Sequence, residues 1–434
     1  MDNNSDKNVG QKIYELCDSI FPICRSLTGE GVRKTISILN QYIEDTGVQF
    51  DVHEVPSGTQ AFDWTVPDEW VIRDAYIEDE SGNRIIDFRK NNLHVMGYST
   101  AVDTWCDLDE LLTHIYTEPD QPEVIPYVTS YYSERYGFCM SENMKNSLTS
   151  GRYHMYIDSE HKKGSLTYAD LVIKGEEEKE ILITSYVCHP SMADNECSGP
   201  SLLAELVRYV ISMKKRRYSY RFVLEPESLG AITYISQHLE VLKANVFAAF
   251  NLTCVGDNYA YSVVETPDAD SISDRVIKNA LIGRENTKFY SFLVRGSDER
   301  QYNAPGVDIP MISFCRSKFG TFPEYHTSDD NMSFVSPEGF MGSYEVMTKT
   351  ILALENNYRF RTTVLCEPQL SKRGLSKAIS QKSNYGNEMY FRHFLAFSNG
   401  KNDLIDIGNK INVPAADLLP YAERLAEEGL VERI

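Results

Sequence analysis

Apolar and polar positions follow two different periods along this chain, and the changes of period divide it into elements. Near the N-terminus, apolar residues recur at helical spacing over residues 9–20 and 32–43, which predicts two helices. Residues 48–55 alternate strictly, as in a half-buried strand. Further along, the β-branched run 181–187 predicts a buried strand, and the apolar spacing of residues 202–211 predicts a helix that follows a polar loop.

Strands and helices continue to alternate after this point. Strands are predicted over residues 221–224, 246–252 and 307–314, and helices over residues 232–242 and 272–282. This order predicts an α/β fold with a mostly parallel sheet flanked by helices. A hairpin-like turn through residues 175–179 is expected to return the run 166–174 to the strand at 181–187.

Two other segments have a different composition. Residues 57–165 are rich in aromatic residues and turn signals, which predicts a small, mainly β domain inserted into the α/β domain of residues 1–56 and 166–360. The aromatic side chains either form the core of this insertion or line a saccharide or peptide cleft. Residues 361–434 predict a winged-helix-like domain, but its second helix, near residues 415–428, is acidic. We therefore expect packing or homo-oligomer contacts through this domain and not DNA binding.

Charge and hydropathy narrow the choice of partners and compartment. The formal net charge of -20 argues against nucleic acid and anionic membranes as partners. No apolar run has the length of a signal peptide core or a membrane span, so a cytoplasmic location is expected. The nine cysteines lack any CxxC pair, as expected of reduced thiols.

Imidazole and carboxylate side chains recur just after several predicted strands, where open α/β sheets bind ligands. Separately, each of them also fits a helix cap or a solvated surface. Together they describe one polar site suited to metal-assisted hydrolysis, which needs nitrogen and carboxylate ligands and a general base. The residues concerned are His189, Asp194, Glu225, Glu227, Asp298, Glu299, His326 and Asp329.

The order of these motifs resembles the zinc aminopeptidase superfamily, which includes leucyl aminopeptidases, glutamate carboxypeptidases and single-zinc glutaminyl cyclases. The matching features are His189, the Asp-Asn-x-x-Ser-Gly motif at 194–199, a glutamate pair before Leu229-Gly230, and the Tyr-His-Thr-x-x-Asp motif at 325–330. Across its whole length, the chain is similar to bacterial proteins with an aminopeptidase-like domain that are linked to polysaccharide biosynthesis. That similarity implies an inserted β domain and a C-terminal winged-helix-like domain.

The resemblance also implies roles for individual residues. His189 and His326 would be zinc ligands, and Asp194 would bind or bridge the metal. One glutamate of the pair Glu225 and Glu227 would activate water, and the division of roles between them stays open. Substrate contacts would come from three residues of the later loops, Asp298, Glu299 and Tyr325. A fourth contact would come from Arg25 in the N-terminal loop 24–31, a loop whose alternative role is to cap the second helix.

Two departures from the superfamily pattern change the expected metal content. The usual His-x-Asp is His189-Pro190-Ser191 here, and the aspartate expected after the next strand is replaced around residues 251–254. One zinc ion is therefore expected in place of two.

Three functions follow from these residues and from the resemblance. The first is a zinc-dependent amide hydrolase, an aminopeptidase-like metalloprotease that acts on a peptide. The second is a hydrolase or transferase of amide or acyl groups on amino sugars in polysaccharide biosynthesis. The third is a non-catalytic binding protein on the same fold.

Overall fold

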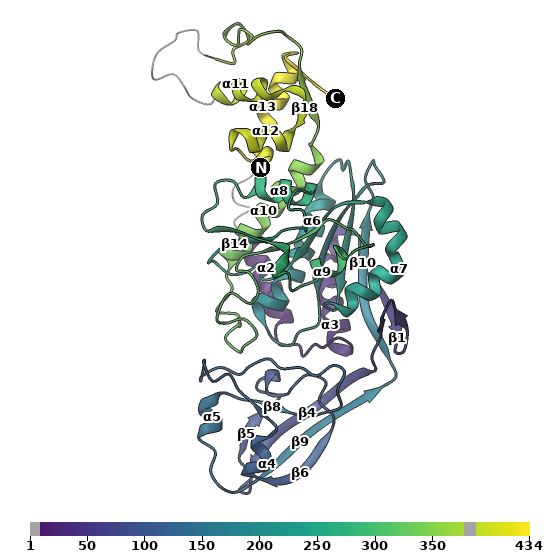
Figure 1. Ribbon diagram of the computed structural model, residues 1–434, viewed down its shortest axis with the longest axis vertical. Coiled ribbons are helices and arrows are strands. Elements are labelled where there is room, and N and C mark those ends of the chain that lie inside the picture. Colours follow the sequence, from purple (N-terminus) through teal and green to yellow (C-terminus); the bar gives the residue numbers. More distant parts are fainter. Residues whose placement is uncertain (1–8, 377–387) are drawn as a thin grey trace. The chain divides into compact units, whose positions relative to one another are not determined.

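An eight-stranded sheet forms the centre of the fold, in the order β1-β10-β12-β11-β13-β16-β14-β15 (Figure 1). The structure is a computed structural model and describes residues 9–376 and 388–434. The strands of this sheet are β1 (Asp51–Pro56), β10 (Ser165–Ile173), β11 (Glu180–Tyr186), β12 (Ser219–Glu225), β13 (Val246–Leu252), β14 (Tyr261–Val264), β15 (Thr287–Tyr290) and β16 (Met311–Cys315). The α/β class predicted from the alternation is confirmed.

Helices cover the sheet as the crossover rules require. They are α2 (Val9–Ile20), α3 (Glu30–Ile43), α6 (Ser198–Ser212), α7 (Leu229–Asn245) and the short α9 (Glu299–Tyr302). Strand β11 is parallel to both of its neighbours, β12 and β13. The chain therefore steps from β11 to β12 in one direction and from β12 to β13 in the other, so right-handed crossovers place α6 and α7 on opposite faces. The carboxyl ends of β11 and β12 meet at this reversal, which is where such sheets bind ligands.

Helix α6 begins unusually close to the sheet because its second residue is a glycine. A Cβ atom on Gly199 would lie 2.2 Å from Ser185 Oγ and 2.4 Å from the carbonyl oxygen of Leu252. The start of α6, and with it the loop that follows β11, is therefore fixed against the ends of β11 and β13.

The hairpin predicted between residues 166–174 and the central strand is wrong. Strand β10 pairs antiparallel with β12, and β12 lies between β10 and β11. The turn signal was correct locally, but the chain after it enters the sheet one position further on. Pairing between strands depends on the whole sheet and not on the turn alone.

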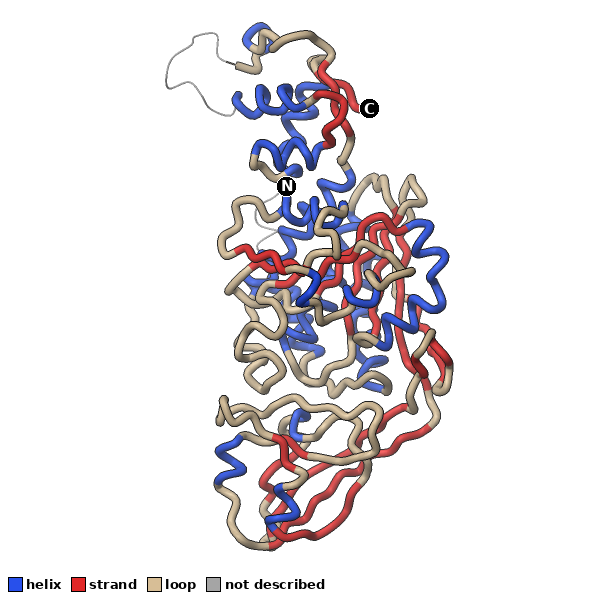
Figure 2. The backbone as a smooth tube through the Cα atoms, viewed as in Figure 1, coloured by secondary structure: helices blue, strands red, loops and turns tan. Residues whose placement is uncertain are grey.

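The inserted segment has its own four-stranded antiparallel sheet, in the order β5-β4-β9-β6 (Figure 1). Figure 2 draws its strands in red, and the longest, β4 and β9, have 11 residues each. The elements of the insertion are β2 (Gln60–Ala61), β3 (Trp64–Thr65), β4 (Glu69–Asp79), β5 (Arg84–Asp87), β6 (Val102–Asp107), α4 (Leu108–Leu112), β7 (Ile115–Tyr116), β8 (Phe138–Cys139), α5 (Glu142–Asn146) and β9 (Arg152–Lys162). Its core is apolar and includes Ile77, Phe138 and Met155.

Clustering of contacts divides the chain into two compact units. The first contains the chain up to Pro267 together with Lys288–Ser343, and the second contains Asp268–Thr287 and Tyr344–Ile434. Helix α10 (Pro337–Glu355) runs from the first unit into the second. The second unit holds a three-stranded sheet in the order β18-β17-β19. The strands of this sheet are β17 (Arg359–Thr362), β18 (Asn399–Asp403) and β19 (Val431–Arg433). The other elements are α8 (Ile272–Ala280), α11 (Glu388–Phe397), α12 (Leu404–Ile411) and α13 (Ala415–Glu427).

The helix pair α12 and α13 begins at a well-formed cap. Asp403 and Asp406 form a capping box, and Arg275 of α8 binds both carboxylates at 2.7–2.8 Å. None of the helices in the described part of the chain combines the length and the apolar character needed to cross a bilayer.

Candidate functional site

Loops at the carboxyl ends of the central strands bring His189, Glu227 and His326 to one pocket of about 480 Å³. His189 follows β11 and Glu227 follows β12, whereas His326 comes from the long loop between β16 and α10. The ring centroids of His189 and His326 are 5.5 Å apart, and His189 Nε2 lies 3.8 Å from Glu227 Oε2. The structure therefore brings together three of the residues that the sequence singled out.

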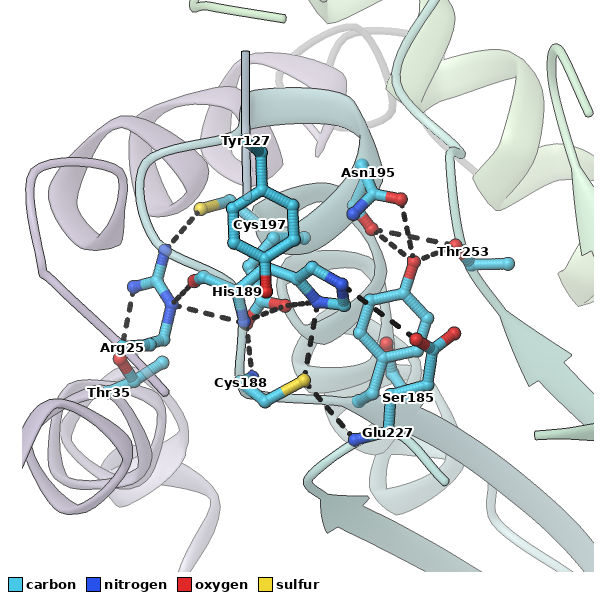
Figure 3. Close-up of polar contacts among 12 residues, drawn as sticks. Arg25, Thr35, Tyr127, Ser185, Cys188, His189, Asn195, Cys197, Glu227 and Thr253 are labelled. Carbon is cyan, nitrogen blue, oxygen red and sulfur yellow. Dashed lines mark hydrogen bonds and ion pairs between the residues drawn. The ribbon is translucent and has the colours of Figure 1, made fainter. Parts of the chain in front are cut away.

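The orientation of His189 is set by Glu196, a residue that the sequence analysis did not single out. Glu196 Oε2 lies 3.2 Å from His189 Nδ1 and accepts a hydrogen bond from the His189 backbone N–H at 3.0 Å. Figure 3 shows the imidazole of His189 in contact with Cys188 and Glu227. Glu196 Oε1 accepts from the Cys188 N–H at 3.0 Å. With Nδ1 engaged in this way, Nε2 of the imidazole faces Glu227.

Glu196 therefore provides the orienting carboxylate that the sequence lacks at Ser191. In metal sites such a carboxylate fixes the tautomer and direction of the ligating imidazole. Burial opposes protonation of His189, but the hydrogen bond with Glu196 and the charge of Glu227 outweigh it and raise the pKa of the imidazole.

Arg25 lies behind His189 and is not among the residues that line the pocket. Its Nε is 3.1 Å from Glu196 Oε1 and donates to the His189 carbonyl oxygen at 2.8 Å, and Nη2 contacts Cys197 Sγ at 3.1 Å. Both side chains of the Arg25–Glu196 pair are at most 1% exposed. Arg25 thus holds the loop that carries His189 and does not face a substrate.

Glu196 reaches His189 because the chain makes a π-helical turn over Ala193–Cys197, just before α6. Such wide turns are rare and are frequently found at functional sites. The carboxylate of Asp330 caps this turn, accepting from the N–H groups of Asp194 at 2.6 Å and of Asn195 at 2.9 Å. The aspartate that ends the Tyr-His-Thr-x-x-Asp motif therefore has a structural partner.

Asp194 is fully buried on this turn, and its Oδ1 accepts from the Gly256 N–H at 2.7 Å. Burial first, and then the charges of Asp257 and Asp330, raise the pKa of its carboxyl. Within the described part of the chain, no hydrogen bond or ion pair joins Asp194 to His189 or His326. The structure thus places Asp194 among other buried carboxylates, and its predicted role as a metal ligand stays a prediction.

The two candidate glutamates occupy different environments. Glu227 lines the pocket, and burial raises the pKa of its carboxyl against the opposing effects of His189 and of a hydrogen bond from Ser297. Glu225 is fully buried, and Tyr302 donates a hydrogen bond to its Oε1 at 2.8 Å. Burial raises the pKa of Glu225 to about 8. Glu227 is thus the glutamate of the pair that can meet a bound molecule.

His326 is held in a strained backbone conformation with its side chain facing the pocket. Its φ is 59°, in the left-handed region that a histidine rarely adopts. Its carbonyl oxygen accepts from the Tyr127 N–H at 2.8 Å, and the Tyr325 ring stacks on the imidazole at 3.9 Å. Tyr325 therefore supports the imidazole.

The Nε2 atom of His326 is buried and has no hydrogen-bond partner among the described residues. Burial, and then the charge of His189, lower the pKa of His326 to about 3. The imidazole is therefore neutral at physiological pH, and a buried nitrogen of this kind requires a partner that the protein itself does not supply.

Tyr127 connects the two imidazoles from the inserted domain. Its ring lies 5.2 Å from that of His189 and 5.0 Å from that of His326. Its pKa is raised well above the usual value by burial. The insertion therefore contributes directly to the pocket, as the cleft hypothesis expected of its aromatic residues.

Asp298 and Glu299, predicted to touch substrate, are buried beneath the pocket. Asp298 Oδ1 accepts from the Ser228 N–H at 2.7 Å, and Ser228 itself has a left-handed φ of 65°. Glu299 accepts from the Gly296 N–H at 2.8 Å and from the Ser313 hydroxyl at 2.7 Å. Both carboxylates hold the loops around the site in place, and neither is among the residues that line the pocket.

Within residues 9–376 and 388–434, Cys188, His189 and Glu196 form one group of three side chains that could bind a metal, and their ligand atoms all lie within 4.8 Å of one another. Arg25 contacts this group directly, so a cation placed there would meet a guanidinium. Burial also raises the pKa of the Cys188 thiol well above its usual value, which disfavours the thiolate that binds metal. The opposite nitrogen of His189 is the better placed metal ligand.

The region where an expected aspartate is missing contains neutral groups that bind one another. Thr253 Oγ1 lies 2.5 Å from Tyr186 Oη. Asn251 Nδ2 donates to Ser297 Oγ at 3.1 Å and to Ser313 Oγ at 2.9 Å. Residues 251–254 contain no carboxylate.

Fold and site together define an aminopeptidase-like α/β protein with a C-terminal winged helix. Residues 14–357 match the model of a family described as a domain of unknown function (DUF4910), and residues 358–433 match a winged helix-turn-helix model. The chain belongs to the DUF4910 family.

Two relatives from Clostridium acetobutylicum are similar over nearly the whole chain. One, named as a candidate polysaccharide biosynthesis protein with an aminopeptidase-like domain, is 41% identical over 431 residues, which are 97% of each chain. A crystal structure of a candidate peptidase from that organism is 38% identical, with a TM-score of 0.91, and the match covers 99% of this chain and 98% of that one. The family resemblance predicted from the motifs is confirmed.

A more distant structure shares the fold alone. The zinc aminopeptidase BSAP from Bacillus subtilis is 14% identical, with a TM-score of 0.58, over 80% of this chain and 95% of that one. The fold is therefore related to that of zinc peptidases.

Proposed function

We propose that this protein hydrolyses an amide bond with the help of one zinc ion, which His189 and His326 would hold. The buried, unpartnered Nε2 of His326 is the observation that carries the proposal. A neutral imidazole with a free nitrogen is a common zinc ligand, and the facing imidazole of His189 is oriented by a carboxylate in the manner of metal sites. The donor atoms present fit one ion.

When bound, zinc supplies Lewis acidity towards a carbonyl oxygen and makes water acidic near neutral pH. Glu227 Oε2 would accept the proton from the attacking water and return it to the leaving nitrogen. A carboxyl whose pKa is raised by burial suits this exchange, because a general base works best with a pKa near the operating pH. Tyr127 and the apolar wall of the pocket would exclude competing water.

This assignment leaves two protein nitrogens as ligands, whereas catalytic zinc sites usually have three protein ligands. We therefore expect zinc to bind more weakly and to exchange more readily than in such sites. Relationship to zinc peptidases by fold, and to a relative named for polysaccharide biosynthesis, supports amide chemistry on a peptide or an amino sugar.

Zinc titration of the metal-free protein, followed by calorimetry and elemental analysis, tests the proposal. About one zinc per chain is expected for the natural protein and for the control His53→Ala, whose imidazole contacts Asp170 away from the site. Binding should be lost in His189→Ala and in His326→Ala. Glu227→Gln should keep the metal and lose hydrolysis.

Three results would contradict parts of this proposal. Absence of zinc binding by the natural protein would leave a non-catalytic binding protein on this fold. Two zinc ions per chain would show that a carboxylate such as Asp194 takes part. Loss of zinc in Glu227→Gln would make Glu227 a ligand and not a base.

A further inference from the structure

We propose that the pocket binds an N-acylated amino sugar with an anionic substituent, and not a free amino acid or a peptide amine. This inference rests on the proposed function and names its substrate class. Three features of the pocket support it: the absence of a spare carboxylate, an exposed aromatic pair at its edge, and a single arginine.

The first feature is the set of charged groups that line the pocket. A site that binds a free α-ammonium group needs a carboxylate to pair with it, since an unpaired buried charge is costly. Among the described residues that line the pocket, Glu227 is the sole carboxylate, and it is assigned to proton transfer. Asp298 and Glu299 accept hydrogen bonds from surrounding loops and are at 0% exposure. A substrate nitrogen that is acylated, and therefore neutral, needs no such partner.

The second feature is an aromatic pair from the inserted domain. Trp64 on β3 and Tyr132 both line the pocket, yet they are 46% and 59% exposed. Their ring centroids lie 5.9 Å apart with an interplanar angle of 53°. Exposed large aromatic side chains at a pocket indicate binding, since burying them is favourable. Their flat apolar faces suit the C–H face of a pyranose ring.

The third feature is Arg300. Among the described residues that line the pocket, it is the one whose side chain carries a permanent positive charge. Its Nη2 donates to Ser228 Oγ, the one side-chain hydrogen bond that Arg300 makes within the described residues. The guanidinium fork binds carboxylate or phosphate oxygens in pairs. The charge of Arg300 acts on Glu227 in the same pocket, but no ion pair joins the two side chains among the described residues, so the guanidinium can take an anionic group of the substrate.

Equilibrium binding of four small probes, by calorimetry on the intact chain with and without zinc, tests the proposal. The probes are N-acetylmuramic acid, N-acetylglucosamine, glucosamine and leucinamide, which separate the acyl group, the carboxylate and the free amine. We expect N-acetylmuramic acid to bind at least tenfold more tightly than N-acetylglucosamine, and both amines to bind more weakly still.

Matched variants assign the preference to the named residues. Arg300→Gln should reduce the binding of N-acetylmuramic acid to the level of N-acetylglucosamine, whereas Arg295→Gln, which alters an arginine outside the pocket lining, should not. Trp64→Ala should weaken both N-acetyl sugars alike. Trp105→Ala is its control, because Trp105 is 43% exposed in the same insertion but stacks on His154.

Tighter binding of leucinamide than of N-acetylmuramic acid would overturn the proposal in favour of an aminopeptidase. An unchanged preference in Arg300→Gln would also overturn it. Sugar binding without any zinc binding would refute the proposed hydrolysis and leave the ligand class in place. Zinc binding and amide hydrolysis without sugar binding would refute the ligand class alone.

Discussion

Replacing Glu196 by glutamine tests whether this carboxylate directs His189 towards a metal. The two carboxylate oxygens face four donors: the N–H groups of Cys188 and His189, His189 Nδ1, and Arg25 Nε. An amide has a single acceptor oxygen, so at least one pair of these donors would face an NH₂ group. The substitution also leaves the Arg25 guanidinium buried without its counter-charge.

The magnitude follows from the burial of the pair. Breaking a buried ion pair by removing one partner costs about 3–5 kcal/mol. Loss of a carboxylate that orients a metal-bound histidine lowers metal affinity by roughly 10–100-fold. Glu196→Gln is therefore expected to lower both the free energy of unfolding and the affinity for zinc.

A matched control separates the two effects. Glu180 forms a buried ion pair with Arg221, 2.6 Å apart, and neither lines the pocket. Glu180→Gln should also reduce the free energy of unfolding, by a smaller amount because Arg221 keeps Asp170 at 3.3 Å, and should leave zinc affinity unchanged. Urea denaturation and zinc titration at pH 7.5 measure the two quantities. Equal zinc affinities in the two variants would refute the orienting role of Glu196.

Three further predictions concern pH and packing. The pKa of the Glu225 carboxyl is raised from 4.5 to about 8, so between these pH values it holds a proton in the folded chain and releases it on unfolding. The free energy of unfolding should therefore fall as pH rises from 4.5 to 8. Glu225→Gln should flatten this dependence by on the order of a few kcal/mol, measured by denaturation at both pH values. The pKa of His326 is lowered from 6.5 to about 3, so the metal-free protein should gain stability as pH rises from 3 to 6.5. His326→Asn, whose asparagine tolerates the left-handed backbone, should remove that gain. An unchanged dependence of stability on pH in this variant would argue against the burial of the His326 imidazole. Gly199→Ala should cost about 1–3 kcal/mol by overpacking against Ser185. Gly151→Ala should leave the melting temperature unchanged, because its added Cβ would meet only the Thr149 carbonyl oxygen, at 4.0 Å.

Much of the candidate site followed from its position relative to the strands. His189, Glu227 and His326 were found because polar residues after parallel strands meet at one edge of a sheet. The choice between the neighbouring glutamates, Glu225 and Glu227, needed the folded structure. Glu225 ends β12 and is buried beside Tyr302, whereas Glu227 lies past the strand end and lines the pocket. Side chains two residues apart point the same way in a regular strand. Pro226 directly follows β12, so this rule does not apply to Glu225 and Glu227.

Glu196 shows a different limit of the sequence. It lies within the motif at residues 194–199, in which the sequence analysis predicted a metal-binding role for Asp194 and none for Glu196. A π-helical turn rotates the two residues relative to an ordinary helix start, so that Glu196 reaches His189 while Asp194 is directed to Gly256. Such a turn has no clear signal in the residues themselves.

The sequence by itself determined the alternation of elements in the α/β part, the approximate bounds of several helices and strands, the different compositions of the insertion and of the C-terminal segment, and the family. These are local properties, since periodicity and turn chemistry depend on near neighbours. The tertiary structure decided the pairing of β10 with β12, the burial of Arg25, Asp298 and Glu299, and the aromatic contribution of the insertion to the pocket. Those features depend on which distant segments compete for the same partner, and only the folded chain resolves that competition.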